Sequence, residues 1–213
     1  TYTESPNLDY LTEATFLGEV LFPADWQIGD SDDSITRNGA NYCEPIIEES
    51  LPAVFNARRL YETYWLYPGS EAELLDTVID DLNERAHIVH HVGHGFRYNM
   101  SVGEGNFMIA DALAMNNGLD HLIQTYAMNC TSCAFDYNCL GESFLLAVDG
   151  GGLTTIGSVR EAFPQTAVYY QDSYYEAMFA DSSSIGEAFT DSHNMYANNA
   201  QIEGSHRWTQ LAG

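Results

Sequence analysis

Two short apolar runs, each stopped abruptly by small and polar residues, constrain the fold of this chain more than any other feature. Residues 86–92 lead directly to His94, and residues 122–128 lead directly to Cys130. Each run has the length and composition of a buried strand. The chain between them is long enough for the loop-and-helix crossover that parallel strands require. If the two strands are neighbours, His94 and Cys130 lie together at the carboxyl edge of one sheet, where open α/β sheets build their sites.

The rest of the chain alternates between strand-like and helix-like segments. Further strands are expected at residues 14–22, 57–64 and 153–158, and helices at residues 42–51, 71–85, 107–115, 139–148 and 169–196. The clearest helix is 71–85, where Ser70 and Glu73 form the pattern of an N-terminal capping box. Residues 96–106 are expected to be a loop. This alternation predicts an α/β fold, a three-layer αβα sandwich with a mainly parallel sheet, forming one domain over residues 1–213.

The charge of the chain excludes several kinds of partner. It carries 31 acidic residues against seven basic ones, all of them Arg, for a net charge of −24. Nucleic acid and anionic membranes repel such a chain, and no run of about 18 apolar residues is present to span a bilayer. We expect a secreted or cell-surface protein. Because the chain starts at Thr1 and stops at Gly213, we also expect a piece of a longer protein with flanking domains.

His94 and Cys130 together supply a nucleophile and its base. Cys130 ends its strand and enters a loop, so its backbone N–H is free to bind an oxyanion. Gly95 is a second candidate donor, because glycine lets the backbone approach a substrate closely. Asp25, just past the end of the first strand, is the candidate acid for orienting the His94 ring. Acidic loops also leave a structural Ca²⁺ open, although no EF-hand spacing is present.

Cys130 and Cys133 also form a C-x-x-C pair, which leaves two other interpretations open. A thioredoxin-like redox pair normally opens a helix after the first strand of a βαβ unit, whereas this pair comes late in the chain. A zinc site would need further ligands, which His90, His91 and His94 could supply. A closed zinc site would leave no free nucleophile, so the dyad is preferred. The remaining cysteines are expected to pack as small apolar side chains.

The same residues resemble the gingipain-like cysteine peptidases, which share the caspase-like fold. The family's catalytic His lies in a Gly-His-Gly at the end of an apolar strand, as in residues 93–95 here. Its nucleophile ends the next apolar strand, as Cys130 does, and is followed here by F-D-Y at 135–137 and C-L-G-E at 139–142. The resemblance runs from about Phe16 to the end of the chain.

This resemblance implies an endopeptidase that acts through a thioester acyl-enzyme. Cys130 is the nucleophile, His94 is the general base, and the amides of Gly95 and Cys130 form the oxyanion hole. Asp25 takes the place of the acid that supports the His. A protein or peptide is the expected substrate, and no metal or other cofactor is required for the chemistry. The alternative is a catalytically inactive caspase-like domain that serves as a structural or binding module of a larger protein.

The resemblance also places the substrate pocket at residues 159–164, where the family has an acidic and an aromatic residue. Here Glu161 would pair with a basic side chain of the substrate, whereas Arg160 would select an acidic one. Phe163 supplies the aromatic wall. The choice between a basic and an acidic residue at the cleaved position therefore stays open.

Overall fold

A parallel sheet forms the centre of the computed structural model, which describes residues 8–180 and 183–199. Its six strands lie in the order β11-β10-β6-β1-β4-β5, and every neighbouring pair is parallel. They are β1 (Glu13–Gly18), β4 (Asn56–Tyr61), β5 (Glu71–Ala72), β6 (Ile88–Val92), β10 (Ile123–Met128) and β11 (Gly152–Gly157). The predicted α/β fold with a parallel sheet is confirmed.

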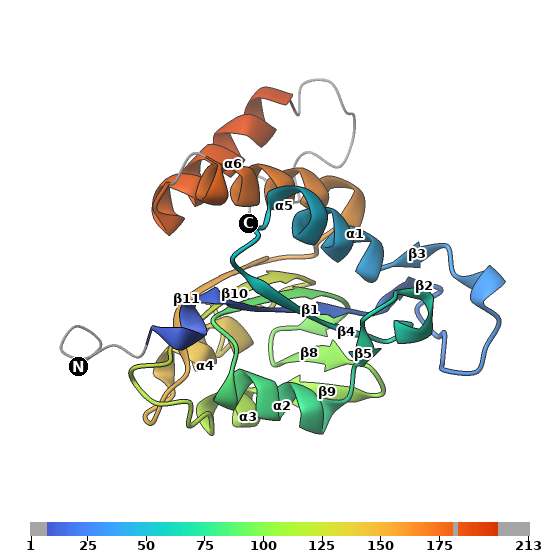
Figure 1. Ribbon diagram of the computed structural model, residues 1–213, viewed down its shortest axis with the longest axis horizontal. Coiled ribbons are helices and arrows are strands. Elements are labelled where there is room, and N and C mark those ends of the chain that lie inside the picture. Colours follow the sequence, from blue (N-terminus) through green and yellow to red (C-terminus); the bar gives the residue numbers. More distant parts are fainter. Residues whose placement is uncertain (1–7, 181–182, 200–213) are drawn as a thin grey trace.

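Helices cover both faces of this sheet (Figure 1). One face carries α1 (Ala40–Pro45), α5 (Pro164–Phe179) and α6 (Ile185–Asn199), and the other carries α2 (Leu75–Glu84), α3 (Ile109–Leu113) and α4 (Leu140–Leu146). Shorter helical turns occupy Asp9–Thr12, Asp32–Ser34, Ile46–Ser50 and Tyr64–Leu66. Within the ranges given above, no helix has the length and apolar character needed to cross a bilayer.

The sheet separates two apolar cores, because successive residues of a strand point to opposite faces. On β1, Phe16 packs into the core beneath α5, together with Tyr175. The next residue, Leu17, packs into the core on the side of α2 and α4, together with Leu82 and Phe144. All five side chains are buried. This two-sided burial explains why the central strands are near-continuous apolar runs in the sequence.

Strand β6 lies between β1 and β10 and positions the candidate site. The register pairs Val92 with both Gly18 and Met128, so the three strands end level with one another. From these ends the chain continues to His94 on one strand and to Cys130 on its neighbour. The predicted adjacency of the two strands is therefore confirmed.

The predicted start of the helix at 71–85 is wrong. The Ser70 hydroxyl does not cap this helix but donates to the carbonyl oxygens of Tyr64 and Tyr67. Helix α2 begins only at Leu75. The residues in between pair with the open edge of β4 and form β5, because that edge offers free backbone partners.

The loop predicted at 96–106 is instead a small antiparallel sheet. It consists of β7 (Gly95–Phe96), β8 (Asn99–Val102) and β9 (Gly105–Met108). Met100 and Val102 of this sheet are buried, and their alternation with polar neighbours is a strand pattern. Three glycines and several polar residues between positions 95 and 108 concealed that pattern.

Candidate active site

A cavity of about 400 Å³ at the carboxyl edge of the sheet contains both members of the predicted dyad. The residues that line it come from the strand ends and from the segment after β11: Leu21, Phe22, Gly93, His94, Phe96, Met128, Asn129, Cys130, Thr131, Glu161, Ala162, Phe163, Pro164 and Gln165. The structure thus brings His94, Cys130, Glu161 and Phe163 around one space. Neither Asp25 nor Arg160 is among these lining residues.

Cys130 lies at the bend where the chain leaves β10. Its half-buried thiol points toward the carbonyl oxygen of Ala162, 3.7 Å away. The next residue, Thr131, has a φ of 55°, in the left-handed region that β-branched residues rarely adopt. The Thr131 amide donates to the Arg160 carbonyl at 3.0 Å, and this bond helps to hold the strained bend. The bend presents the thiol to the cavity.

His94 reaches the cavity from the neighbouring strand. Its Nε2 atom is buried and has no hydrogen-bond partner within the part of the chain that the structure describes. The Cys130 thiol is directed at Ala162 and makes no hydrogen bond to this ring. Joining the two therefore requires the thiol to leave the Ala162 carbonyl. The site contains a thiol and an imidazole that line the same cavity, with no hydrogen bond between them.

Glu19, which was not among the predicted site residues, is the acid that holds the His94 backbone. Its Oε2 accepts the backbone N–H of His94 at 2.7 Å. Burial raises the pKa of Glu19 well above its ordinary value; this hydrogen bond opposes the shift, and repulsion from Glu62 adds to it. The available signal was a lone carboxylate inside the apolar run at 14–22, since a buried acid needs a specific partner.

Asp25 is exposed and does not border the cavity. After Glu19 the chain forms β2 (Val20–Phe22), which pairs with β3 (Arg37–Asn38). Asp25 follows β2 in an exposed turn. Leu21 and Phe22 of β2 line the cavity, whereas Asp25 lies beyond it. The geometry gives no support to the predicted role of Asp25 in orienting the His94 ring.

The amides of Gly95 and Cys130 remain the candidate oxyanion donors. The N–H of Cys130 has no backbone acceptor within the described ranges. The His94 carbonyl accepts a hydrogen bond from the Ser101 amide at 3.0 Å. In an antiparallel pair, hydrogen-bonded and non-hydrogen-bonded positions alternate, so Gly95 is at a non-hydrogen-bonded position opposite Met100. The N–H of Gly95 therefore points away from β8. A Cβ at Gly95 would lie 2.7 Å from Nδ2 of Asn129, so a larger residue would displace the Asn129 side chain.

Asn129 connects the two strand ends through a buried histidine. Its Nδ2 donates to Nδ1 of His91 at 3.3 Å, and Nε2 of His91 donates to the Ser101 carbonyl at 2.9 Å. Because a carbonyl oxygen only accepts, the His91 proton is assigned to Nε2. Burial lowers the pKa of His91 to about 4 and that of His90 to about 3, so both rings are neutral at pH 7. These histidines are part of the buried framework beneath the site.

A metal site would require several ligands that converge on one point. Within residues 8–180 and 183–199, no three side chains of His, Cys, Asp or Glu are arranged to hold a metal ion. The zinc interpretation therefore finds no ligand set among these residues. The structural Ca²⁺ stays a prediction from the acidic composition, and no step of the chemistry below is assigned to a metal.

The structure separates the three residues predicted to bind substrate. Phe163 lines the cavity and is half-buried, and Glu161 lines it and is exposed. Arg160 is exposed, and its guanidinium pairs with Asp136 at 3.2 Å. It borders a second cavity, of about 90 Å³, between the sheet and helices α5 and α6. Of the two charged residues, only Glu161 can face a side chain bound beside the dyad.

The four cysteines are all free thiols. Cys43 and Cys139 are buried, as predicted for small packed residues. Burial raises the pKa of Cys133 to about 12, and its sulfur fills the space beside Gly141. Cys130 is the thiol that lines the cavity.

A parallel α/β sandwich with a thiol and an imidazole on neighbouring strand ends has the architecture of a caspase-like cysteine peptidase. The model of peptidase family C25 matches residues 2–213. The chain therefore belongs to peptidase family C25, and the predicted resemblance to the gingipains is confirmed. A search of curated proteins finds no match.

Solved structures share the fold of this chain. One described as "Structure of Protease" has a TM-score of 0.71 and 15% identity over 97% of this chain and 46% of its own. The Arg-specific cysteine proteinase gingipain R (RgpB) has a TM-score of 0.64 and 14% identity over 90% and 43%. The complex of Porphyromonas gingivalis RgpB pro- and mature domains has a TM-score of 0.63 and 13% identity over 90% and 44%. The chain spans less than half the length of these proteins, and at such identities the likeness concerns the fold alone.

Proposed function

We propose that this chain is a cysteine endopeptidase that cleaves peptide bonds through Cys130 and His94. The observation that carries the proposal is the cavity, in which neighbouring strands present a thiol and an imidazole nitrogen without a partner. Membership of peptidase family C25 supports the reaction class. The roles of the individual residues follow from their chemistry and positions.

In the proposed reaction, His94 takes the proton of the Cys130 thiol, and the thiolate attacks the carbonyl carbon of the substrate. The amides of Cys130 and Gly95 donate to the carbonyl oxygen as it becomes negatively charged. The C–N bond breaks as His94 returns the proton to the leaving amine, which leaves a thioester on Cys130. A water molecule that His94 deprotonates then hydrolyses the thioester. Glu19 keeps His94 in place through its backbone N–H.

The proposed substrate is a protein or peptide that lies across the cavity and contacts Phe163 and Glu161. The thiol, the imidazole and two amides complete the chemistry, so no cofactor is proposed for it. We further propose that the domain acts outside the cell or at its surface, as part of a longer chain. The net charge of −24 favours solubility and is consistent with this location. Fractionation of the source cells with an antibody to the domain tests the location.

Alkylation of Cys130 tests the dyad. We expect iodoacetamide to label Cys130 before the other three cysteines, and His94→Ala to slow this labelling by about 10²-fold. Mass spectrometry of the digested protein locates the label. The matched control is Cys133→Ser, which removes a half-buried thiol that does not line the cavity. We expect this variant to leave the rate at Cys130 unchanged and Cys130→Ser to abolish peptide cleavage.

An inactive structural or binding domain is the second candidate, and one observation favours it. The Cys130 thiol points to the Ala162 carbonyl and not to His94. Slow labelling of Cys130 that does not depend on His94, together with the absence of peptide cleavage, would support this candidate over the peptidase.

A further inference from the structure

We propose that the cavity beside Cys130 receives a large apolar side chain, aromatic or aliphatic, from the substrate residue whose carbonyl is attacked. The inference rests on the proposed peptidase function and specifies its substrate class. The cavity borders both Cys130 and His94, so a peptide whose carbonyl reaches the thiol places the adjacent side chain in this space. The volume of about 400 Å³ lies within the roughly 300–1,000 Å³ typical of ligand sites.

Carbon-rich side chains from four separate segments form the walls of the cavity. Phe22 comes from β2, Phe96 from β7, Met128 from the end of β10, and Phe163 from the segment before α5. Phe22 and Phe96 are each 45% exposed, so they place uncovered aromatic surface at the cavity. An apolar side chain that covers this surface removes it from water. A charged side chain in the same place would lose part of its hydration, which costs free energy.

The charged groups around the cavity do not supply a buried partner for a substrate ion. Arg160 pairs with Asp136 and lies outside the cavity. The Arg37 guanidinium lies over the Phe22 ring, 5.9 Å from its centroid. Glu161 is the one acidic residue among those that line the cavity, and it is exposed. Solvent screens the exposed Glu161 carboxylate, so its ion pair with a Lys or Arg side chain of the substrate would be weak.

Two reagents that differ only in their side chain test this inference on the intact chain. Tosyl-phenylalanyl and tosyl-lysyl chloromethyl ketone both alkylate an active-site nucleophile after binding in the manner of a substrate. We expect the phenylalanyl reagent to label Cys130 at least about tenfold faster than the lysyl reagent, a difference that a selective pocket readily provides. Equal rates, or faster labelling by the lysyl reagent, would overturn the inference.

Iodoacetamide separates failure of this inference from failure of the proposed function, because it has no side chain to bind. If its labelling of Cys130 depends on His94 while the lysyl ketone is the faster ketone, the dyad stands and the apolar class is wrong. If labelling is independent of His94 and both ketones are inert, the peptidase function is wrong and the apolar class is wrong with it.

Phe96 and Tyr98 provide a matched pair of variants. Each is 45% exposed, and their rings lie 5.0 Å apart, but Phe96 lines the cavity and Tyr98 does not. We expect Phe96→Ala to lower the ratio of phenylalanyl to iodoacetamide labelling by about tenfold. Tyr98→Ala should leave this ratio unchanged. An equal response of the two variants would contradict the proposed location of the substrate side chain.

Discussion

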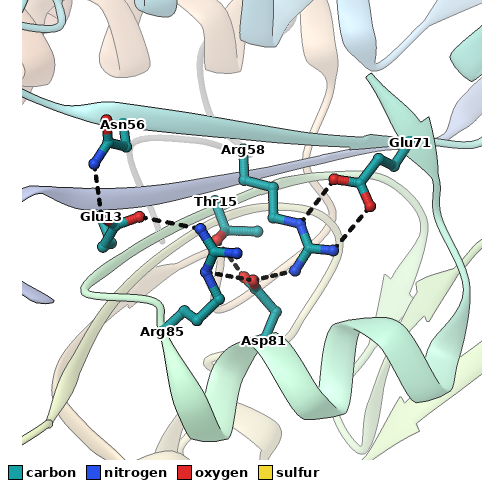
Figure 2. Close-up of polar contacts among 7 residues, drawn as sticks. All are labelled: Glu13, Thr15, Asn56, Arg58, Glu71, Asp81 and Arg85. Carbon is teal, nitrogen blue, oxygen red and sulfur yellow. Dashed lines mark hydrogen bonds and ion pairs between the residues drawn. The ribbon is translucent and has the colours of Figure 1, made fainter. Parts of the chain in front are cut away.

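Two groups of acidic residues, each with buried members, have different surroundings in this molecule. The first lies where β1 and β4 face α2, and an arginine pairs with its acids (Figure 2). Asp81 of α2 accepts hydrogen bonds from Arg58 of β4 and Thr15 of β1. Arg58 also donates two hydrogen bonds to the Glu71 carboxylate, from Nε at 3.2 Å and from Nη2 at 2.9 Å. In this group the acids meet a cation.

The second group lies along the carboxyl edge of the sheet, next to the candidate site. Glu19 follows β1, Glu62 follows β4 and Glu73 follows β5, and these strands are adjacent. Burial is the main cause that raises the pKa of each, and mutual repulsion adds to it for Glu19 and Glu73. Neither oxygen of Glu73 has a well-aligned hydrogen-bond partner in the described ranges, although the Gly103 amide is close enough to favour ionisation slightly.

The comparison teaches how a chain with 31 acidic residues and seven Arg distributes its few cations. Arg58 pairs with the buried Asp81, whereas burial raises the pKa of the acids at the carboxyl edge, which favours their neutral form. For Glu19 this has a functional consequence, because an ionised acid at this position would place negative charge near the thiolate of the proposed reaction. Four measurements test this contrast, in order of decreasing expected effect.

Arg58→Ala breaks the paired group and should have the largest effect. It leaves Asp81, whose side chain is 1% exposed, without its closest cation. We expect the free energy of unfolding to fall by about 3–5 kcal/mol, measured by urea denaturation at pH 7. The double variant Arg58→Ala/Asp81→Asn should recover much of this loss, since no unpaired charge remains. A loss below about 1 kcal/mol would mean that Arg85 or water replaces Arg58.

Glu73→Met should change stability in the opposite direction. It replaces a buried carboxyl group that lacks a good partner with an apolar side chain of similar length. We expect the free energy of unfolding at pH 8 to rise by about 1–3 kcal/mol. The control is Glu104→Gln on the exposed neighbouring turn, which should have an effect within about 0.5 kcal/mol. Destabilisation by Glu73→Met would show that this carboxyl group has a structural role.

The raised pKa of Glu73 makes the stability difference between Glu73→Met and the unmodified chain depend on pH. Above its ordinary value of 4.5, the unfolded chain has released a proton that the folded chain still binds. Stability from this group is therefore complete below pH 4.5 and is lost as the pH rises through the folded pKa. We expect the stability gained by Glu73→Met to grow between pH 4.5 and pH 8 in urea titrations. A difference that stays constant with rising pH would show that the pKa is not raised, and one that shrinks would show that it is lowered.

Glu71→Gln should have the smallest effect and the opposite pH dependence. The hydrogen bond from Arg58 lowers the pKa of Glu71, so its contribution exists above pH 4.5 and is lost as the pH falls. Its side chain is 58% exposed, and solvent screening limits the loss to less than about 1 kcal/mol at pH 7. The same urea titration measures it. A loss as large as that of Arg58→Ala would mean that the exposed branch of the network, and not Asp81, dominates.

The strands that carry His94 and Cys130 show how far local pattern predicts this structure. Both strands are apolar on two faces, so their existence and their parallel pairing follow from composition and from the length of the crossover. The sequence does not predict β5, because this two-residue strand depends on the open edge of β4, which exists only after the larger sheet has formed. It does not predict the β7–β9 hairpins either, because glycine and polar residues conceal the alternation of these short strands, which pair only with one another.

The residues around the dyad show where prediction from sequence ends. Glu19 and Asp25 both follow the first strand closely, and although the apolar run around Glu19 marks it as a buried acid, nothing local names His94 as its partner. The answer depends on β2, which pairs with β3 and brings the chain past the cavity before Asp25. In the same way, Arg160 and Glu161 are neighbours in sequence, and only the contact with Asp136 removes Arg160 from the cavity.

By itself, the sequence determined the parallel α/β class and the placement of Cys130 and His94 at one edge of the sheet, because apolar runs and their abrupt ends act over a few residues. The tertiary structure alone decided which acid supports His94, which charge faces the cavity and which acids remain without a cation. These outcomes depend on contacts between segments that are distant in the chain, and the energy of a charged or polar group is set by the partners that folding brings to it.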